Sequence, residues 1–325
     1  MGKRDVIEYL EKHHGKIVDF LAKMIKFKSV SYADGPTAGT GLEFELQEWL
    51  RDELIKMGFD KVDFWAADQE AIRPNIVATI KGEGGTNRSL MFNGHIDVVK
   101  VTDEELKIWV SDPWSPMVKN GAVYGRGAID MKGGVASMIW AAKALIDNNV
   151  KLKGDVYVAC EAAEESVQGA TIGTNAIIER GYRPSLAIVQ EPTNCEIHIS
   201  SNGLFAFELN VRGKPVHSSC RNQVIFPQRY GIPTGSRVGV DAIAKAVPFI
   251  EMFQRLEVDL QHRWQDKTQY LGGGGYPLHE DHEGVGIFGL TPALVEAGPY
   301  VGSVAGYCKL TYCVFHPPWI TAEEL

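Results

Sequence analysis

The sequence has little cysteine, and the cysteines it has form no recognisable pairing. Five are scattered over 325 residues, and none stands in a Cys-x-x-Cys pair. Disulfide frameworks and thiolate zinc sites depend on paired or closely spaced cysteines, so the sequence predicts neither. We therefore expect reduced thiols and a cytoplasmic protein.

Long hydrophobic runs and an excess of positive charge are also missing. No apolar stretch approaches the roughly 20 residues that a membrane-spanning helix needs, and the first residues lead into an amphipathic segment, not a signal-peptide core. The formal net charge is −8, from 33 basic and 41 acidic residues. This balance predicts that neither a membrane nor a nucleic acid is a partner, although a local pocket can still bind an anionic small molecule.

The composition that is present, 45% hydrophobic and 23% charged, is typical of a globular enzyme, and the length favours two domains. Up to residue 202, apolar periodicity alternates between helical and strand spacing. Helices are expected at 5–27, 41–57, 133–147 and 174–179, and strands at 75–80, 90–92, 155–160 and 186–190. This alternation predicts an α/β domain over residues 1–202, with a mostly parallel sheet flanked by helices.

The pattern changes after Asn202. Phe205, Phe207, Leu209 and Val211 alternate with other residues at period two, which is typical of a strand covered on one side only. A helix at 240–256 and a strand at 307–314 follow. Residues 203–325 are therefore expected to form a second, smaller α+β domain.

Four short motifs place histidine and carboxylate side chains at the ends of expected strands or in a glycine-rich loop. They are Asn93-Gly94-His95-Ile96-Asp97, the loop from Gly125 to Gly134, Ala163-Glu164-Glu165 and Gln190-Glu191-Pro192-Thr193. The carboxyl ends of parallel strands share one edge of a sheet, and ligands bind there. The side chains expected to meet at that edge are His95, Asp130, Glu164, Glu165 and Glu191.

One imidazole among several carboxylates is a ligand set for Zn²⁺, Mn²⁺ or Co²⁺. Crowding these acids without a cation would raise their pKa values, and two cations sharing a bridging carboxylate, typically about 3.5–4 Å apart, would relieve that cost. Asp97 is placed to orient the imidazole of His95. Each motif alone is a weak match, since a lone histidine after a strand is usually ordinary, and the argument rests on their expected co-location.

In combination, these motifs resemble a known family. The matching stretches are Gly-His-x-Asp-Val-Val at 94–99, Gly-Arg-Gly-x-x-Asp-Met-Lys-Gly-Gly at 125–134, Glu-Glu at 164–165 and Glu-Pro-Thr at 191–193. They are similar to those of the dinuclear-zinc amidohydrolases and peptidases that include acetylornithine deacetylase, succinyl-diaminopimelate desuccinylase, aminoacylase and carboxypeptidase G. The match runs from about residue 18 to residue 314.

The resemblance implies a role for each residue of the set. Asp130 would bridge two divalent cations, most simply Zn²⁺, with Co²⁺ or Mn²⁺ as alternatives. His95 and Glu191 would complete one metal site, and Glu165 would serve the other. Glu164 would be the general base that takes a proton from the attacking water, a step worth typically 10²–10⁴-fold.

A further match lies in the second domain. Gly213-Lys214-Pro215-Val216-His217-Ser218-Ser219 resembles the family's lid motif, whose histidine reaches the active site of the partner subunit. The resemblance therefore implies that His217 is catalytic in trans and that the chain forms a homodimer through its lid. Without the family context, a surface histidine in a hairpin would be the default interpretation.

The sequence departs from the family near its end. Family members return from the lid to the catalytic domain and gain a final histidine ligand there, and no clear counterpart is present here. His316, after a lid strand, is a poor substitute, and the glycine-rich stretch before His279 and His282 favours an exposed loop. We therefore expect an incomplete chain whose lid breaks off at Leu325 and one of whose metal sites lacks a ligand.

The leading expectation is hydrolysis of the amide bond of an N-acyl amino acid, by deacetylation or desuccinylation. A di- or carboxypeptidase acting on short peptides is the alternative within the same chemistry, and an inactive scaffold is the alternative outside it. Arg221, Asn222 and Arg237 are candidates to pair with a substrate carboxylate, although surface ion pairs are the commoner role for such residues.

Overall fold

The computed structural model describes residues 3–31, 42–67, 72–84, 88–166, 169–198, 201–231, 238–264 and 288–325. The chain divides into two compact units, Met1–Pro192 and Thr193–Leu325, and each is described by itself. Within the described ranges, no helix is both long enough and apolar enough to cross a membrane.

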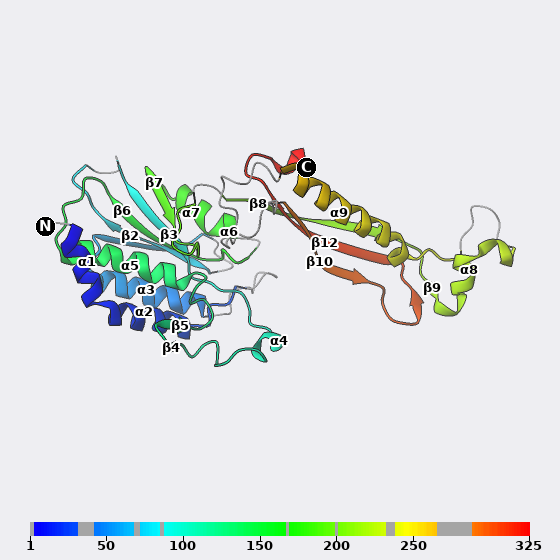
Figure 1. Ribbon diagram of the computed structural model, residues 1–325, viewed down its shortest axis with the longest axis horizontal. Helices are drawn as coiled ribbons and strands as arrows, with labels where there is room; N and C mark the ends of the chain where they lie inside the picture. The colour runs from blue at the N-terminus through cyan, green and yellow to red at the C-terminus, as the bar shows by residue number, and fades with distance from the viewer. Residues whose placement is uncertain are drawn as a thin grey trace. The chain divides into compact units, whose positions relative to one another are not determined.

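The first unit is built on a five-stranded sheet (Figure 1). Its strands, in spatial order, are β1 (Lys61–Ala66), β2 (Pro74–Ile80), β6 (Val156–Glu161), β3 (Leu90–His95) and β7 (Leu186–Val189). Strand β3 pairs in parallel with both β6 and β7, whereas β2 is antiparallel to its neighbours β1 and β6. Of these strands, β2 alone runs against the others, so the predicted α/β fold with a mostly parallel sheet is confirmed.

Helices cover both faces of this sheet, and the strand residues alternate between two cores. Ile76 and Ala78 of β2 join the larger core with α2, α3 and α5, whereas Val77 packs on the opposite face with Ile177 of α7. Figure 1 shows α1, α2, α3 and α5 stacked on one side of the sheet. Strands buried on both faces read as continuous apolar runs, which is why β2 and β6 were recognisable in the sequence.

The bounds of the helices agree with the expected ones in most places. The helices are α1 (Lys3–Lys12), α2 (His14–Lys26), α3 (Glu43–Met57), α4 (Asp103–Leu106), α5 (Lys132–Asp147), α6 (Gly169–Ile172) and α7 (Thr174–Glu179), and a short hairpin joins β4 (Met117–Lys119) to β5 (Ala122–Tyr124). The prediction of one helix over 5–27 was wrong. The helix breaks at His13, where ψ is 8°, and histidine and glycine in His13-His14-Gly15 are poor helix formers.

Gly134, near the start of α5, lies against the segment that leads to Glu191. A Cβ atom at Gly134 would lie 2.3 Å from the main-chain oxygen of Gln190. We expect Gly134→Ala to lower the free energy of unfolding by about 1–3 kcal/mol, because backbone must shift to relieve the clash. Denaturant unfolding measures the loss.

The matched control for this prediction is Gly15→Ala in α2, where a Cβ atom would meet nothing within 4 Å. It should leave the unfolding free energy unchanged or raise it slightly, because alanine is the better helix former. Equal stability losses in the two variants would contradict the close packing of α5 against the strand end.

The second unit is a three-stranded antiparallel sheet with one long helix against it. Its main elements are β8 (Gly203–Arg212), α9 (Ala242–Trp264), β10 (Gly289–Ala297) and β12 (Tyr307–His316), and the sheet order is β10-β12-β8. The period-two pattern in β8 correctly predicted a strand, and α9 extends beyond the expected 240–256. Strand β10 was not predicted, because Pro292 interrupts its pattern at a point where the register shifts.

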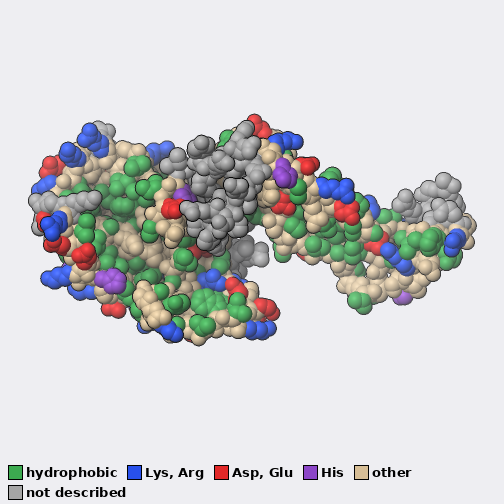
Figure 2. Space-filling view, viewed as in Figure 1, with side chains coloured by type: hydrophobic (Ala, Val, Ile, Leu, Met, Phe, Trp, Pro, Cys, Tyr) green, Lys and Arg blue, Asp and Glu red, His purple; other side chains and the backbone are tan. Residues whose placement is uncertain are grey.

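Shorter elements complete this unit. They are β9 (Val216–His217), η1 (Ser218–Cys220), α8 (Arg221–Ile225), η2 (Pro227–Tyr230), β11 (Ser303–Val304) and the single turn η4 (Ala322–Glu324). Large hydrophobic side chains such as Leu204, Leu294 and Val295 are exposed on this unit. Figure 2 shows hydrophobic side chains reaching its surface between charged ones.

Candidate metal centre

Three neighbouring parallel strands deliver most of the candidate ligands to one edge of the first unit's sheet. His95 is the last residue of β3, and it pairs in register with Glu161 at the end of β6. Glu164 and Glu165 follow β6 in the next loop, and Glu191 follows β7. The convergence expected from the strand ends is therefore present in the fold.

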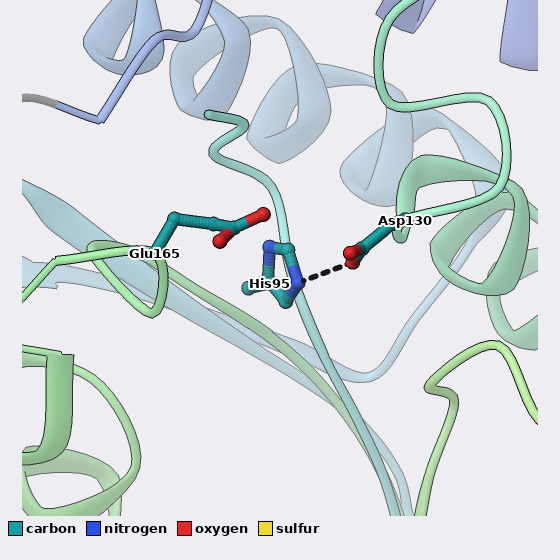
Figure 3. Close-up of side chains that lie close together, drawn as sticks. All are labelled: His95, Asp130 and Glu165. Atoms are coloured by element: carbon teal, nitrogen blue, oxygen red, sulfur yellow. Dashed lines mark hydrogen bonds and ion pairs between the residues drawn. The ribbon is translucent and has the colours of Figure 1, made fainter. Parts of the chain in front are cut away.

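The acidic side chains surround the Nε2 atom of His95. It lies 3.1 Å from Oδ1 of Asp130, 3.6 Å from Oε1 of Glu191 and 3.9 Å from Oε2 of Glu164. Figure 3 shows Asp130 and Glu165 approaching the imidazole from different sides. Asp130 comes from the loop before α5, where its peptide bond to Met131 is cis.

Two groups of three side chains have ligand atoms within 4.8 Å of one another, which is close enough to share an ion. One is His95, Asp130 and Glu165, and the other is His95, Glu164 and Glu191. The imidazole is 1% exposed, whereas the side chains of Asp130 and Glu164 are about half exposed, at 50% and 48%. A buried nitrogen with an open rim of oxygens fits a metal ion that keeps a position for water or substrate.

The main chain of Asp97 orients the imidazole of His95. Nδ1 of His95 donates a hydrogen bond to the main-chain oxygen of Asp97 at 3.0 Å, and the Asp97 carboxylate lies 3.6 Å from the same nitrogen. A carbonyl oxygen can only accept, so the hydrogen is on Nδ1 and Nε2 faces the acids. Nε2 is then the nitrogen that can bind a metal once its own proton has left.

The pKa values of these groups show that negative charge on the clustered carboxylates is unfavourable without a cation. Burial raises the pKa of Glu165 to about 7, with a further contribution from Asp130, and burial also raises that of Glu191 to about 7. Burial alone would lower the pKa of His95, but hydrogen bonds to Asp130 and Asp97 overcome it and raise the value to about 11. A bound cation would reverse these shifts, since it favours ionised carboxylates and a neutral imidazole.

Metal binding is therefore expected to strengthen as the pH rises. The protons on Glu165, Glu191 and His95 must leave before these groups bind a cation, so affinity should rise by about tenfold or more per pH unit below pH 7. Titration of the metal-free protein with Zn²⁺ at pH 5.5, 6.5 and 7.5 measures this dependence. The same affinity at all three values would contradict the prediction.

Metal affinity should rise with pH, but the same raised carboxyl pKa values make the metal-free protein less stable as the pH rises. Between pH 4.5 and about 7 the folded protein holds more protons on Glu165 and Glu191 than the unfolded chain does. Their contribution to the free energy of unfolding is therefore present below pH 4.5 and lost as the pH rises through about 7. The thermal stabilisation that Zn²⁺ causes should accordingly be larger at pH 7.5 than at pH 5.5.

The sequence did not predict the buried charged residues behind the centre. Arg73 and Glu43 are 2% and 1% exposed and form an ion pair at 2.8 Å. Glu161 is also buried and accepts a hydrogen bond from Thr174, and burial raises its pKa to about 7. No motif spacing marks these residues. The only signal was Arg73 standing directly before the apolar strand β2.

The remaining predicted residues lie in the second unit or outside the described residues. His217 is exposed at the end of β9, and its Nδ1 lies 2.9 Å from Oγ of Ser219. Arg221 pairs with Asp241, the ordinary surface role considered for it, and Asn222 is exposed in α8. Arg237, His279 and His282 fall outside the described residues.

A mostly parallel sheet whose strand ends present one histidine and several acids is the arrangement of a metallo-amidohydrolase. The chain belongs to peptidase family M20/M25/M40, whose model matches residues 91–309. The predicted family resemblance is confirmed.

Two curated relatives and one solved structure illustrate the similarity. The N-formyl-4-amino-5-aminomethyl-2-methylpyrimidine deformylase of Halalkalibacterium halodurans is 31% identical over 328 residues, covering 100% of this chain and 69% of the relative. The succinyl-diaminopimelate desuccinylase of Wolbachia sp. subsp. Brugia malayi is 34% identical over 209 residues, covering 62% of this chain and 48% of the relative. An M20 family metallo-carboxypeptidase from Sulfolobus solfataricus has the same fold, with a TM-score of 0.63 at 19% identity over 95% of this chain and 73% of its own.

The chain spans 66–69% of the length of two deformylase relatives and about half that of the desuccinylase. The comparisons therefore establish the family of the chain and its class, a hydrolase. The activity of the whole protein, its substrate and its partners are matters for proposal.

Proposed function

We propose that the protein hydrolyses the amide bond of a small N-acyl compound, with an N-acyl amino acid as the leading substrate class. The observation that carries this proposal is the meeting of His95, Asp130, Glu164, Glu165 and Glu191 at one edge of the sheet. The names of the relatives, a deformylase and a desuccinylase, describe removal of a small acyl group from nitrogen.

The ligand roles follow the resemblance, and the structure brings the proposed ligands close together. Asp130 would bridge two divalent cations, most simply Zn²⁺, with His95 and Glu191 on one and Glu165 on the other. Bound there, the cations would acidify a water molecule and polarise the scissile carbonyl. The types of ligand support this proposal. Both three-residue groups contain His95 and two carboxylates, and a bound cation would stabilise the ionised form of those carboxylates.

Glu164 is the proposed general base. Its Oε2 lies 3.9 Å from His95 Nε2, and 48% of its side chain is exposed, so it can reach both the centre and an entering substrate. Burial raises the pKa of Glu164 above the ordinary glutamate value, which brings that pKa closer to neutral pH. A base with such a pKa can take a proton from water and return it to the leaving nitrogen.

The remaining predictions become proposals about the whole protein. We propose that His217 completes the centre of a partner subunit and that the exposed apolar side chains of the second unit contribute to a homodimer. Ser219 supports this role by holding the His217 ring through Nδ1. All five cysteines are free thiols, which is consistent with the proposed cytoplasmic location.

The proposal is tested by a substrate panel on the metal-loaded protein. N-succinyl-diaminopimelate, N-acetylornithine, an N-formylated aminomethylpyrimidine and simple dipeptides are assayed side by side, with amine release as the readout. Turnover of an N-acyl substrate above the dipeptides supports a deacylase. Preferred cleavage of dipeptides would move the assignment to a peptidase, and no turnover of any substrate by protein carrying two metal ions would support an inactive scaffold.

A further inference from the structure

The loop that carries Glu164 and Glu165 is held by two buried carboxylates. Oε1 of Glu43, in α3, accepts a hydrogen bond from the main-chain N–H of Ala163 at 3.0 Å. The two carboxylate oxygens of Asp97 accept from the N–H groups of Glu164 and Glu165, at 3.2 and 3.1 Å. Three successive amides of this loop therefore bind side chains that lie deeper in the unit, with Glu43 1% and Asp97 0% exposed.

Two buried carboxylates that bind successive amides of one loop repel each other unless a cation compensates them. Arg73 supplies that charge: its Nε lies 2.8 Å from Oε2 of Glu43, and its Nη2 lies 3.6 Å from Oδ2 of Asp97. The guanidinium also donates to Oγ of Ser31 at 2.8 Å and to Oγ of Ser166, the residue after the Glu164–Glu165 pair, at 3.4 Å. The Arg73 side chain is 2% exposed, so bulk solvent screens these contacts little.

The shape of the guanidinium makes the arrangement specific. Its planar fork carries five N–H donors, and here they serve carboxylates and hydroxyls in several directions at once. A lysine ammonium at the same place is a single point of charge and cannot span these partners. Arg73 does not reach the ligand atoms, and it acts on them through Glu43 and Asp97.

We propose that Arg73 is a positioning residue of the metal centre: it fixes Glu43 and Asp97, and through them it sets where the loop places Glu164 and Glu165. The inference rests on the proposed function, since it concerns the same site. It goes beyond that function because it assigns the placement of Glu164, the proposed base, and Glu165, a proposed ligand, to Arg73, which lies outside all four sequence motifs.

The test compares Arg73→Lys and Arg73→Met with the unaltered full chain. Amide hydrogen exchange of the metal-free protein is measured at Ala163, Glu164 and Glu165, together with binding of Zn²⁺. We expect Arg73→Lys to speed exchange at these three amides at least tenfold, with exchange in β3 unchanged. One of the two zinc ions should bind at least tenfold more weakly, and kcat should fall with little change in KM.

Arg180→Lys is the matched control, because Arg180 also makes a two-point pair with a carboxylate, that of Asp63, on the outside of the same unit. It should change none of these readouts. Should Arg73→Met fail to fold, the lysine variant still decides the question.

Unchanged exchange at residues 163–165 in Arg73→Lys would overturn the proposal, and so would an equal acceleration across the whole sheet, which would indicate general destabilisation. The outcome is separable from that of the proposed function. If the unaltered chain turns over no amide substrate but Arg73→Lys still loosens the loop and weakens zinc binding, the positioning role stands and the proposed activity falls.

Discussion

Replacing Glu164 with glutamine is expected to lower kcat by about 10²–10⁴-fold while the protein keeps its bound metal. The amide of glutamine has nearly the shape of the carboxylate, but it cannot take up the proton of the attacking water. Glu164 approaches His95 Nε2 less closely than Asp130 and Glu191 do, so losing its charge should affect proton transfer more than metal affinity. Steady-state kinetics and elemental analysis of the same preparation measure the two effects.

A suitable control is Glu251→Gln, since Glu251 is an exposed glutamate of α9 that pairs only with the neighbouring Arg255 in the contacts described. It should leave kcat unchanged. If Glu164→Gln kept full activity, the assignment of the base would be wrong. If it lost activity and metal together, Glu164 would be a ligand instead.

Asp130→Asn is expected to reduce metal binding as well as activity, because Asp130 is the proposed bridge between the two ions. An amide group offers one good oxygen ligand where a bridge needs two, and it carries no charge to offset the cations. We expect the content of metal to fall from two ions per chain to one or none, and kcat/KM to fall at least 100-fold, beyond the usual effect of losing an indirect partner of a ligand. Metal analysis after dialysis and kinetics in excess Zn²⁺ measure both.

The comparison variant is Asp52→Asn, an exposed aspartate of α3 that pairs with its neighbour Arg51. Its metal content and activity should match those of the unaltered chain. Two ions per chain in Asp130→Asn would contradict the bridging role and would move it to another carboxylate of the set.

The centre could be predicted from the sequence because its parts follow a simple rule of sheets. His95 ends an apolar strand and Glu164 and Glu191 follow one closely, and parallel strands end at the same edge. The prediction needed only the strands, their common direction and the residue types at their ends. Asp130 required more, since it comes from a loop, and the family's glycine-rich motif supplied it.

The supporting network could not be predicted in the same way. Arg73 precedes a strand and Glu43 lies in a helix, and both types of residue are usually exposed. Their burial follows from tertiary packing, which brings α3 and the start of β2 behind the loop of Glu164. Two features were missed for local reasons. The break at His13 was missed because the helical periodicity continues through residues of weak helix propensity, and strand β10 was missed because Pro292 interrupts its pattern.

Anomalous diffraction from crystals of the zinc-loaded protein tests the central claim most directly. We expect two zinc peaks roughly 3.5–4 Å apart, with the carboxylate of Asp130 bonded to both and His95 and Glu191 on one of them. A zinc ion bound away from Asp130, or an Asp130 carboxylate without a metal bond, would contradict a two-metal centre at the ends of β3, β6 and β7.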